Sequence, residues 1–230
     1  MRTTLPLAVA ALGLIALAGC GSPAEKPAAQ ASAPSTQAAS AAPSAPPLSR
    51  VDLRPRVKAA ALTAEDWTAA GNAGQPESEK VDPSASPRVL GWCDPRISSD
   101  DDILVEFERK WSGATSDTLG YGKSIAATII EEAKKAMSVC SDYDRGTSKV
   151  SVASEFTVPA QPGVTAQHSY CVTARFDKGT TNSACFVILA RDVPGGTIVS
   201  RTHVQSGSVD NAKEFLSELI PALAANITKA

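Results

Sequence analysis

Several basic and aromatic residues of this sequence have the chemistry to bind an anionic or amphipathic ligand. A guanidinium group offers a planar fork of hydrogen-bond donors that suits a carboxylate or a phosphate. The strands predicted below place the basic residues on one face of a sheet, with an aromatic side chain at its edge. The candidate ligand-binding residues are Arg175, Arg191, Arg201, His203, Trp111 and Tyr121. The alternative is a solvated sheet face whose charges serve solubility and protect an edge strand.

The histidines and the acidic runs form no catalytic or metal-binding pattern. His168 and His203 lie in predicted strands, and no Gly-x-Ser-x-Gly elbow accompanies them. Asp100–Asp102 and Asp142–Asp144 lack the alternating ligands and the glycine of a calcium loop. We therefore expect no catalytic residue, no bound metal and no cofactor.

Composition and charge exclude other classes of function. The chain has 230 residues, of which 22 are basic and 24 acidic, and its formal net charge is −2. Because no basic excess is available to neutralise phosphates, we expect no nucleic-acid partner. Gly122-Lys123-Ser124 opens a predicted helix as a phosphate-binding loop does, but Asp117 stands where that loop requires its first glycine.

The first twenty residues predict export and attachment to a membrane. Residues 1–19 are typical of a signal peptide, since their apolar run, Leu5–Leu17, is shorter than the roughly 20 residues of a spanning helix. The run ends in Leu17-Ala18-Gly19-Cys20, which resembles the lipobox of bacterial lipoproteins. That resemblance implies a diacylglycerol on Cys20, an acyl chain such as palmitate on its amine, and an anchor on the outer face of the cytoplasmic membrane. The alternative is a secreted protein cut nearby, with Cys20 incidental.

Residues 20–49 contain the lipidated cysteine and a predicted disordered tether. Ala, Pro and Ser make up 22 of the 29 residues from Gly21 to Ser49, a composition that buries almost no apolar surface. We expect a spacer, and a tail that binds the cell wall is the alternative.

Residues 50–230 predict an α+β domain. Thr63 and Asp66 form a capping box for a short helix, and the apolar periodicity of the remaining chain alternates between strand and helix. The predicted elements are a strand at 102–111, a loop at 112–120, a helix at 121–140, strands at 149–158, 167–176, 184–192 and 197–205, and a helix at 209–227. We expect a mainly antiparallel sheet of about five strands with both long helices packed on one face.

Turn residues predict one disulfide directly. Asp177-Lys178-Gly179 has the composition of a three-residue hairpin loop, whose last residue adopts the left-handed backbone that glycine favours. Such a loop pairs residues whose numbers add up to 356, as those of Cys171 and Cys185 do. The remaining pair is then Cys93–Cys140. A zinc site is the alternative, but no Cys-x-x-Cys pair supports it.

The next hairpin decides which face carries the basic residues. Pro194-Gly195-Gly196 is expected to be a second three-residue loop, which pairs residues whose numbers add up to 390. Ile198 and Val204 then join Phe186 and Ile188 on the face toward the helices. The opposite face is then expected to carry Arg191, Val199, Arg201, His203 and the disulfide, and Arg175 is expected beside them. A slip of one residue would move Arg201 and His203 under the helices.

The order of elements and the cysteine spacing resemble a known family. The chain is similar to the extracellular sensor domain of the mycobacterial kinase PknH, which also occurs in stand-alone lipoproteins of actinobacteria. The shared features are Ala61-Leu62-Thr63, Trp92-Cys93, Trp111-Ser112-Gly113, a helix ending at Cys140 and the Cys171–Cys185 hairpin. The resemblance implies a sheet flanked by helices, the two disulfides above and a cleft that binds a ligand. This chain carries no kinase segment, so we expect no signalling through an attached kinase.

These observations predict a lipid-anchored, extracytoplasmic and non-enzymatic domain that binds a small ligand or an envelope component. One alternative is an interaction module that docks on another envelope protein or on a cell-wall polymer. Another is a hydrolase whose site has no recognised motif.

Overall fold

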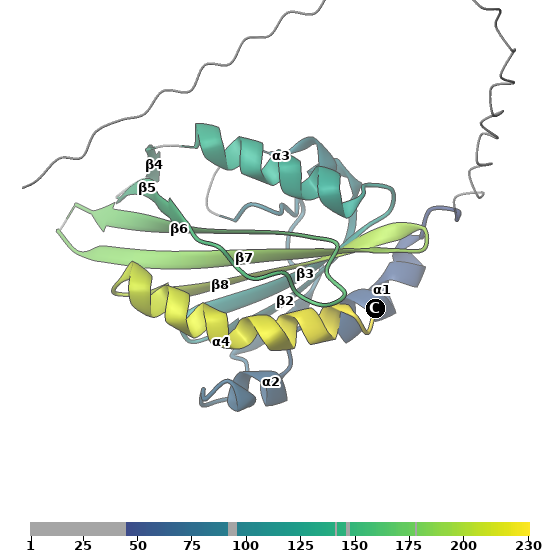
Figure 1. Ribbon diagram of the computed structural model, residues 1–230, viewed down its shortest axis with the longest axis horizontal. Helices are drawn as coiled ribbons and strands as arrows, with labels where there is room; N and C mark the ends of the chain where they lie inside the picture. Colours follow the sequence, from purple (N-terminus) through teal and green to yellow (C-terminus); the bar gives the residue numbers. More distant parts are fainter. Residues whose placement is uncertain (1–44, 92–95, 141, 146–147, 178) are drawn as a thin grey trace, which may run out of the picture. The chain divides into compact units, whose positions relative to one another are not determined.

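The computed structural model describes residues 45–91, 96–140, 142–145, 148–177 and 179–230 of the chain (Figure 1). The predictions for the signal peptide, for Cys20 and for residues 20–44 of the tether lie outside this part. Cys93 also lies outside this part, and the predicted Cys93–Cys140 pairing therefore lies outside it too. Among the described residues, none of the helices combines the length and apolar composition that crossing a membrane requires.

The described residues form one antiparallel sheet of eight strands, rather than the five expected. The strands are β1 (Ser78–Val81), β2 (Ile103–Trp111), β3 (Ala114–Tyr121), β4 (Tyr143–Arg145), β5 (Ser148–Glu155), β6 (Ala166–Phe176), β7 (Thr181–Val193) and β8 (Gly196–Ser206). Their order across the sheet is β1-β2-β3-β8-β7-β6-β5-β4. The α+β class and the antiparallel pairing are as predicted.

The two long helices lie on opposite faces of the sheet, so the prediction that both share one face was wrong (Figure 1). The helices are α1 (Arg50–Ala60), α2 (Ala64–Ala69), α3 (Ala126–Val139) and α4 (Val209–Ile227). α1, α2 and α4 cover what we call the α4 face, and α3 covers the α3 face. The reason lies in β7, where every residue from Ala184 to Ala190 is buried. A strand with a continuous apolar run must be covered on both sides.

The segment 112–120, expected to be a loop, contains the central strand β3. Ser112 and Gly113 form a two-residue turn between Trp111 and Ala114, and Gly113 has a φ of 77°. Such a turn suits a hairpin, because glycine adopts positive φ without steric cost. Gly120 lacks a side chain where α1 crosses the strand, since a Cβ atom there would lie 2.8 Å from Val57. Because most residues of β3 are small or polar, the segment does not show the alternation of apolar and polar residues that predicts a strand.

The β6–β7 hairpin has the predicted register. Cys171 lies opposite Cys185, and the two are joined by a disulfide with a Cα–Cα distance of 4.0 Å. Gly179 has a φ of 80°, as the turn requires. Both cysteines face α4, where the Cys185 Sγ lies 3.6 Å from the carbonyl oxygen of Val209.

The β7–β8 register was wrong by one residue. Val193 pairs with Gly196, so the turn has two residues, Pro194 and Gly195, and the φ of Gly195 is 84°. Proline followed by a glycine with positive φ is the pattern of a type II turn. The slip exchanges the faces of all β8 side chains. As a result, Arg201 and His203 pair with Ile188 and Phe186 on the α3 face.

Candidate functional site

The structure does not bring the six predicted ligand-binding residues together. Arg201, His203 and Tyr121 belong to the α3 face. Trp111 lies in the core of the α4 face, where its ring stacks on Trp67 with centroids 4.9 Å apart.

The two other predicted arginines lie elsewhere. Arg191 donates from Nη1 to the carbonyl oxygen of Ile227 at the end of α4, at 3.3 Å. Arg175 is exposed near the β6–β7 turn. Of the six residues, only Arg201 lines the cavity described next.

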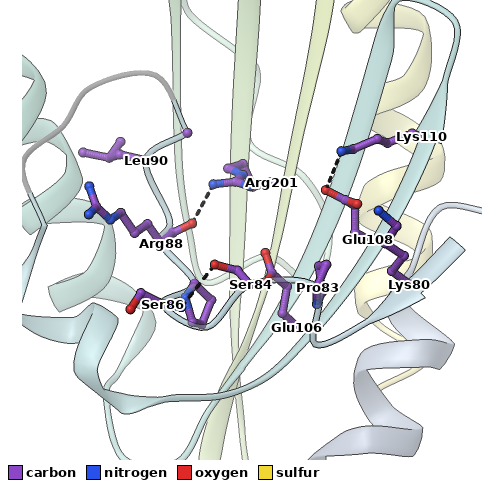
Figure 2. A pocket seen from close by; sticks show the side chains of 12 residues that line it. Lys80, Pro83, Ser84, Ser86, Arg88, Leu90, Glu106, Glu108, Lys110 and Arg201 are labelled. Atoms are coloured by element: carbon purple, nitrogen blue, oxygen red, sulfur yellow. Dashed lines mark hydrogen bonds and ion pairs between the residues drawn. The ribbon is translucent and has the colours of Figure 1, made fainter. Parts of the chain in front are cut away.

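A charged groove of about 340 Å³ opens on the α3 face between the strands and the loop that follows β1 (Figure 2). Glu106, Glu108 and Arg201 project from the strands, and the segment 83–91 forms the facing wall. The charged residues that line it are Lys80, Arg88, Glu106, Glu108, Lys110 and Arg201.

The floor of the groove follows a row of charges across four adjacent strands. Lys80 of β1 lies opposite Glu108 of β2, Glu108 opposite Asp117 of β3, and Asp117 opposite Arg201 of β8. The two carboxylates are direct cross-strand neighbours, an arrangement that destabilises a sheet. Cations on either side compensate them, since the Lys110 Nζ lies 3.1 Å from the Glu108 Oε2 and Arg201 pairs with Asp117.

Each nitrogen of the Arg201 guanidinium donates a hydrogen bond to a protein group. Its Nε donates to the Asp117 Oδ2 at 3.0 Å, its Nη2 donates to the same oxygen, and its Nη1 donates to the carbonyl oxygen of Arg88 at 2.6 Å. The side chains of Arg201 and Asp117 are 11% and 1% exposed. Burial, together with the charge of Arg201, lowers the pKa of His203 to about 4, so this imidazole is neutral at pH 7. Neither residue therefore offers an anion the free positive charge that the sequence predicted.

Hydrogen bonds fix the wall of the groove at three places. The Glu106 N–H donates to the Asp82 Oδ1 at 3.0 Å, and the Asp82 N–H donates back to the Glu106 carbonyl at 2.7 Å. Further along, Arg88 accepts from Arg201. The Val89 N–H then donates to the Asp100 Oδ1 at 2.9 Å. The wall is thus tied to β2, to β8 and to the segment that directly precedes β2.

Carboxylate oxygens of the groove, and of Asp117 beside it, have no donor among the described residues. No described residue donates a hydrogen bond to the Glu106 Oε2, the Glu108 Oε1 or the Asp117 Oδ1. Glu106 is only 5% exposed. Burial, then the neighbouring Asp117 and Glu108 carboxylates, raise the pKa of Glu106 to about 7, although Arg201 opposes them. The groove therefore accepts hydrogen bonds, and one of its acids changes charge near neutral pH.

Sequence reasoning missed the acidic residues of this site. Glu106 and Glu108 belong to the strand predicted at 102–111 and Asp117 to the predicted loop at 112–120, and none of the three was among the predicted ligand-binding residues. The signal that would have found them is the Ser112-Gly113 turn, whose two-residue register places Glu108 directly opposite Asp117.

Other acidic residues singled out in the sequence hold the backbone. Asp102 accepts from the N–H groups of Lys123 and Ser124 at 2.7 and 2.6 Å, so the backbone donors that a phosphate would need already bind a carboxylate. Within the described residues, no group of three or more His, Cys, Asp or Glu side chains is placed to hold a metal ion.

Replacing Glu106 with glutamine is expected to change how stability depends on pH. The pKa of about 7 in the folded protein exceeds the ordinary value of 4.5, so the folded state takes up a proton between these pH values. Stability must therefore fall as the pH rises through this window, by up to about 1.4 kcal/mol per pH unit. The E106Q variant lacks this loss. Its free energy of unfolding, relative to that of the wild type, is therefore expected to increase from pH 4.5 to pH 7. Urea unfolding at several pH values measures this free energy for both proteins. The prediction is wrong if the difference between them does not change with pH.

The comparisons with known proteins support a distant structural relationship. No protein-family model and no curated protein matches the chain. The crystal structure of the extracellular domain of PknH from Mycobacterium tuberculosis is similar, with a TM-score of 0.50, 10% identity, and coverage of 80% of this chain and 98% of that chain. An uncharacterised protein from Rhizobium leguminosarum aligns with a TM-score of 0.20 and 10% identity over 71% of this chain and 77% of that one. This chain therefore shares the fold of the PknH extracellular domain.

Proposed function

We propose that this protein is a lipid-anchored, extracytoplasmic domain of the sensor type, which binds a small ligand in the charged groove and catalyses no reaction. Cys20 carries the anchor, and the predicted tether from Gly21 to Ser49 separates the folded domain from the membrane. The ligand comes from the cell envelope or from the medium outside it.

The location is supported by two independent observations. The N-terminal residues have the pattern of a lipoprotein signal, and the fold is that of a domain described as extracellular in PknH. The disulfide between Cys171 and Cys185 fits an oxidising compartment outside the cytoplasm.

The observation that carries ligand binding is the buried Oε2 of Glu106, which has no described donor, in the carboxylate of a residue that lines an open groove. Burial of a polar group without a hydrogen bond costs about 1–3 kcal/mol, so a fold retains such a group at an expense to its stability. The Glu106 side chain lines a cavity large enough for a compact organic molecule, and its Oε2 is buried without a described donor. A ligand that donates hydrogen bonds would offset this cost.

The test is the recovery of a small molecule that depends on the groove. The full-length protein, extracted from its native membrane in mild detergent, is expected to retain a small compound that mass spectrometry detects. In the S86W variant an indole ring fills the groove from its exposed wall, and the compound is expected to be lost. The C20A variant is expected to leave the membrane fraction, because it cannot accept the diacylglycerol.

The outcomes separate the two parts of the proposal. If the wild type and S86W retain the same compounds, ligand binding in the groove is wrong. If C20A still sediments with the membrane, lipid anchoring through this residue is wrong. The circular dichroism spectrum of S86W serves as the control for its fold.

One observation favours a hydrolase as a second candidate. A carboxyl group with a pKa near 7 close to other carboxyl groups is the arrangement that general acid catalysis uses. Such an enzyme also needs a second carboxylate that is free to attack or to activate water. Glu108 and Asp117 are each paired with a cation of the protein, so we rank ligand binding first.

A further inference from the structure

We propose that the ligand is a compact zwitterion, whose ammonium group binds between Glu106 and Glu108 and whose anionic group binds Lys80 and Lys110 at the rim. This inference rests on the proposed function and names the class of ligand for the same groove. Free amino acids and the ends of short peptides share this chemistry.

The floor of the groove selects a cation rather than an anion. Arg201 neutralises Asp117, and Lys110 contacts one oxygen of Glu108. Glu106 forms no ion pair with any described cation. Its carboxyl group accepts a hydrogen bond from the backbone of Ser84, and its own N–H donates to Asp82. An ammonium group is therefore the counter-charge that an ionised Glu106 lacks.

An ammonium group also matches the acceptors that remain. It has three N–H donors and no acceptor. The Glu106 Oε2 and the Glu108 Oε1 are buried acceptors without a described donor. The two residues lie two positions apart on one strand, so their side chains project from the same face about 7 Å apart. A cation in the groove can therefore lie close to both carboxylates.

The rim of the groove supplies the opposite charge. Lys80 is exposed, and the Lys110 side chain is 44% exposed, so both amines can reach a ligand in solution. Figure 2 shows both lysines on the Glu108 side of the groove, away from Arg88. Positive charge at one end and acceptors on the floor suit a molecule that carries both signs of charge, and the cavity of about 340 Å³ limits its size.

Binding is expected to depend on pH through Glu106. The charged groups that face it are Glu108 from β2, Asp117 from β3, Arg201 from β8, Lys80 from β1 and Arg88 from the wall. When an ammonium group binds, the Glu106 carboxyl releases its proton to water and the ammonium keeps its own three. Affinity should therefore rise about tenfold between pH 6 and pH 8, as the ionised fraction of a group with a pKa near 7 does.

The experiment compares four probes with the same carbon chain. Dissociation constants of the full-length protein are measured by calorimetry for 4-aminobutyrate, butylamine, butyrate and 1-butanol, with triglycine as the peptide arm. We expect 4-aminobutyrate to bind more tightly than butylamine, and no binding of butyrate or butanol. The E106Q variant should weaken both amine probes at least tenfold, whereas K110Q should weaken only the zwitterion. E218Q, an exposed substitution on α4, is the matched control and should change nothing.

Each outcome decides the inference. Butyrate that binds as tightly as 4-aminobutyrate would overturn it, as would amine affinities that E106Q leaves unchanged. Urea unfolding of E106Q at pH 8 is the control that separates a loss of binding from a loss of folding. If none of the probes binds but the S86W variant still loses its co-extracted compound, the ligand class is wrong and the proposed function stands. If that compound does not depend on the groove either, both fail. Tighter binding of triglycine than of 4-aminobutyrate would assign the site to peptide ends.

Discussion

Replacing Asp117 with alanine is expected to destabilise the protein by about 3–5 kcal/mol, because the substitution leaves Arg201 buried without its carboxylate. The two side chains are 11% and 1% exposed, so water cannot take over the role of the lost partner. Arg201 would keep only its hydrogen bond to the Arg88 carbonyl. Urea unfolding followed by tryptophan fluorescence measures the change, since the stacked Trp67 and Trp111 rings report on the core.

A double variant separates the cost of the unpaired charge from a loss of packing. Exchanging both residues for apolar ones, D117L with R201M, removes both charges at similar volume and is expected to cost less than D117A alone. The control is R54A, which breaks an ion pair to Asp82 whose arginine side chain is 57% exposed. Such pairs contribute about 0–1 kcal/mol. A D117A variant as stable as R54A would show that the Arg201–Asp117 pair does not hold the sheet together.

Removing the disulfide between Cys171 and Cys185 by exchange of both residues for alanine is expected to cost about 2–5 kcal/mol. The bond closes a hairpin whose cysteines are 14 positions apart, and it restricts the unfolded chain as well as the core beneath α4. The measurement is the urea midpoint of the double variant against the oxidised wild type.

The control for that prediction is a protein in which Cys93 and Cys140 are both replaced with alanine, because a reductant would also break the predicted bond between them. In that protein a reductant breaks the Cys171–Cys185 bond without removing its sulfur atoms from the core, so it reports the effect of this cross-link alone. The variant that lacks Cys171 and Cys185 should unfold at a lower urea concentration than the oxidised protein, with or without reductant. An unchanged midpoint would mean that the packing of β6, β7 and α4 supplies the stability by itself.

The groove explains why the floor of the sheet tolerates an unfavourable arrangement. Glu108 and Asp117 face each other across two strands, and Glu106 is buried close by with a raised pKa. A sequence selected for stability alone would avoid like charges at opposed positions. Breaks of local rules of this kind are expected where a site has a function to perform. The proposed zwitterion would remove the conflict by placing a cation between the acids.

Local chemistry was sufficient for the β6–β7 turn and for two of the helices. The Asp177–Gly179 loop predicted the register of β6 and β7, and with it the disulfide between Cys171 and Cys185. The capping box of Thr63 and Asp66 starts α2, and α4 extends over Val209–Ile227 as its apolar stripe predicts. These features depend on short-range geometry, which the amino-acid sequence contains in full.

The candidate site depended on long-range packing, which the sequence by itself did not reveal. The length of the turn at Pro194-Gly195 decides to which face every β8 side chain points. With two residues in the turn, Arg201 lies on the same face as Asp117 and pairs with it. β3 lacks apolar alternation because its Gly120 admits α1 and its Asp117 pairs with Arg201, so only its neighbours identify it as a strand. The periodicity of the apolar residues determined the α+β class, and the first twenty residues determined the likeness to an exported lipoprotein. Only the tertiary structure decided which charges meet, because a shift of one residue in a strand reverses the face to which each side chain points.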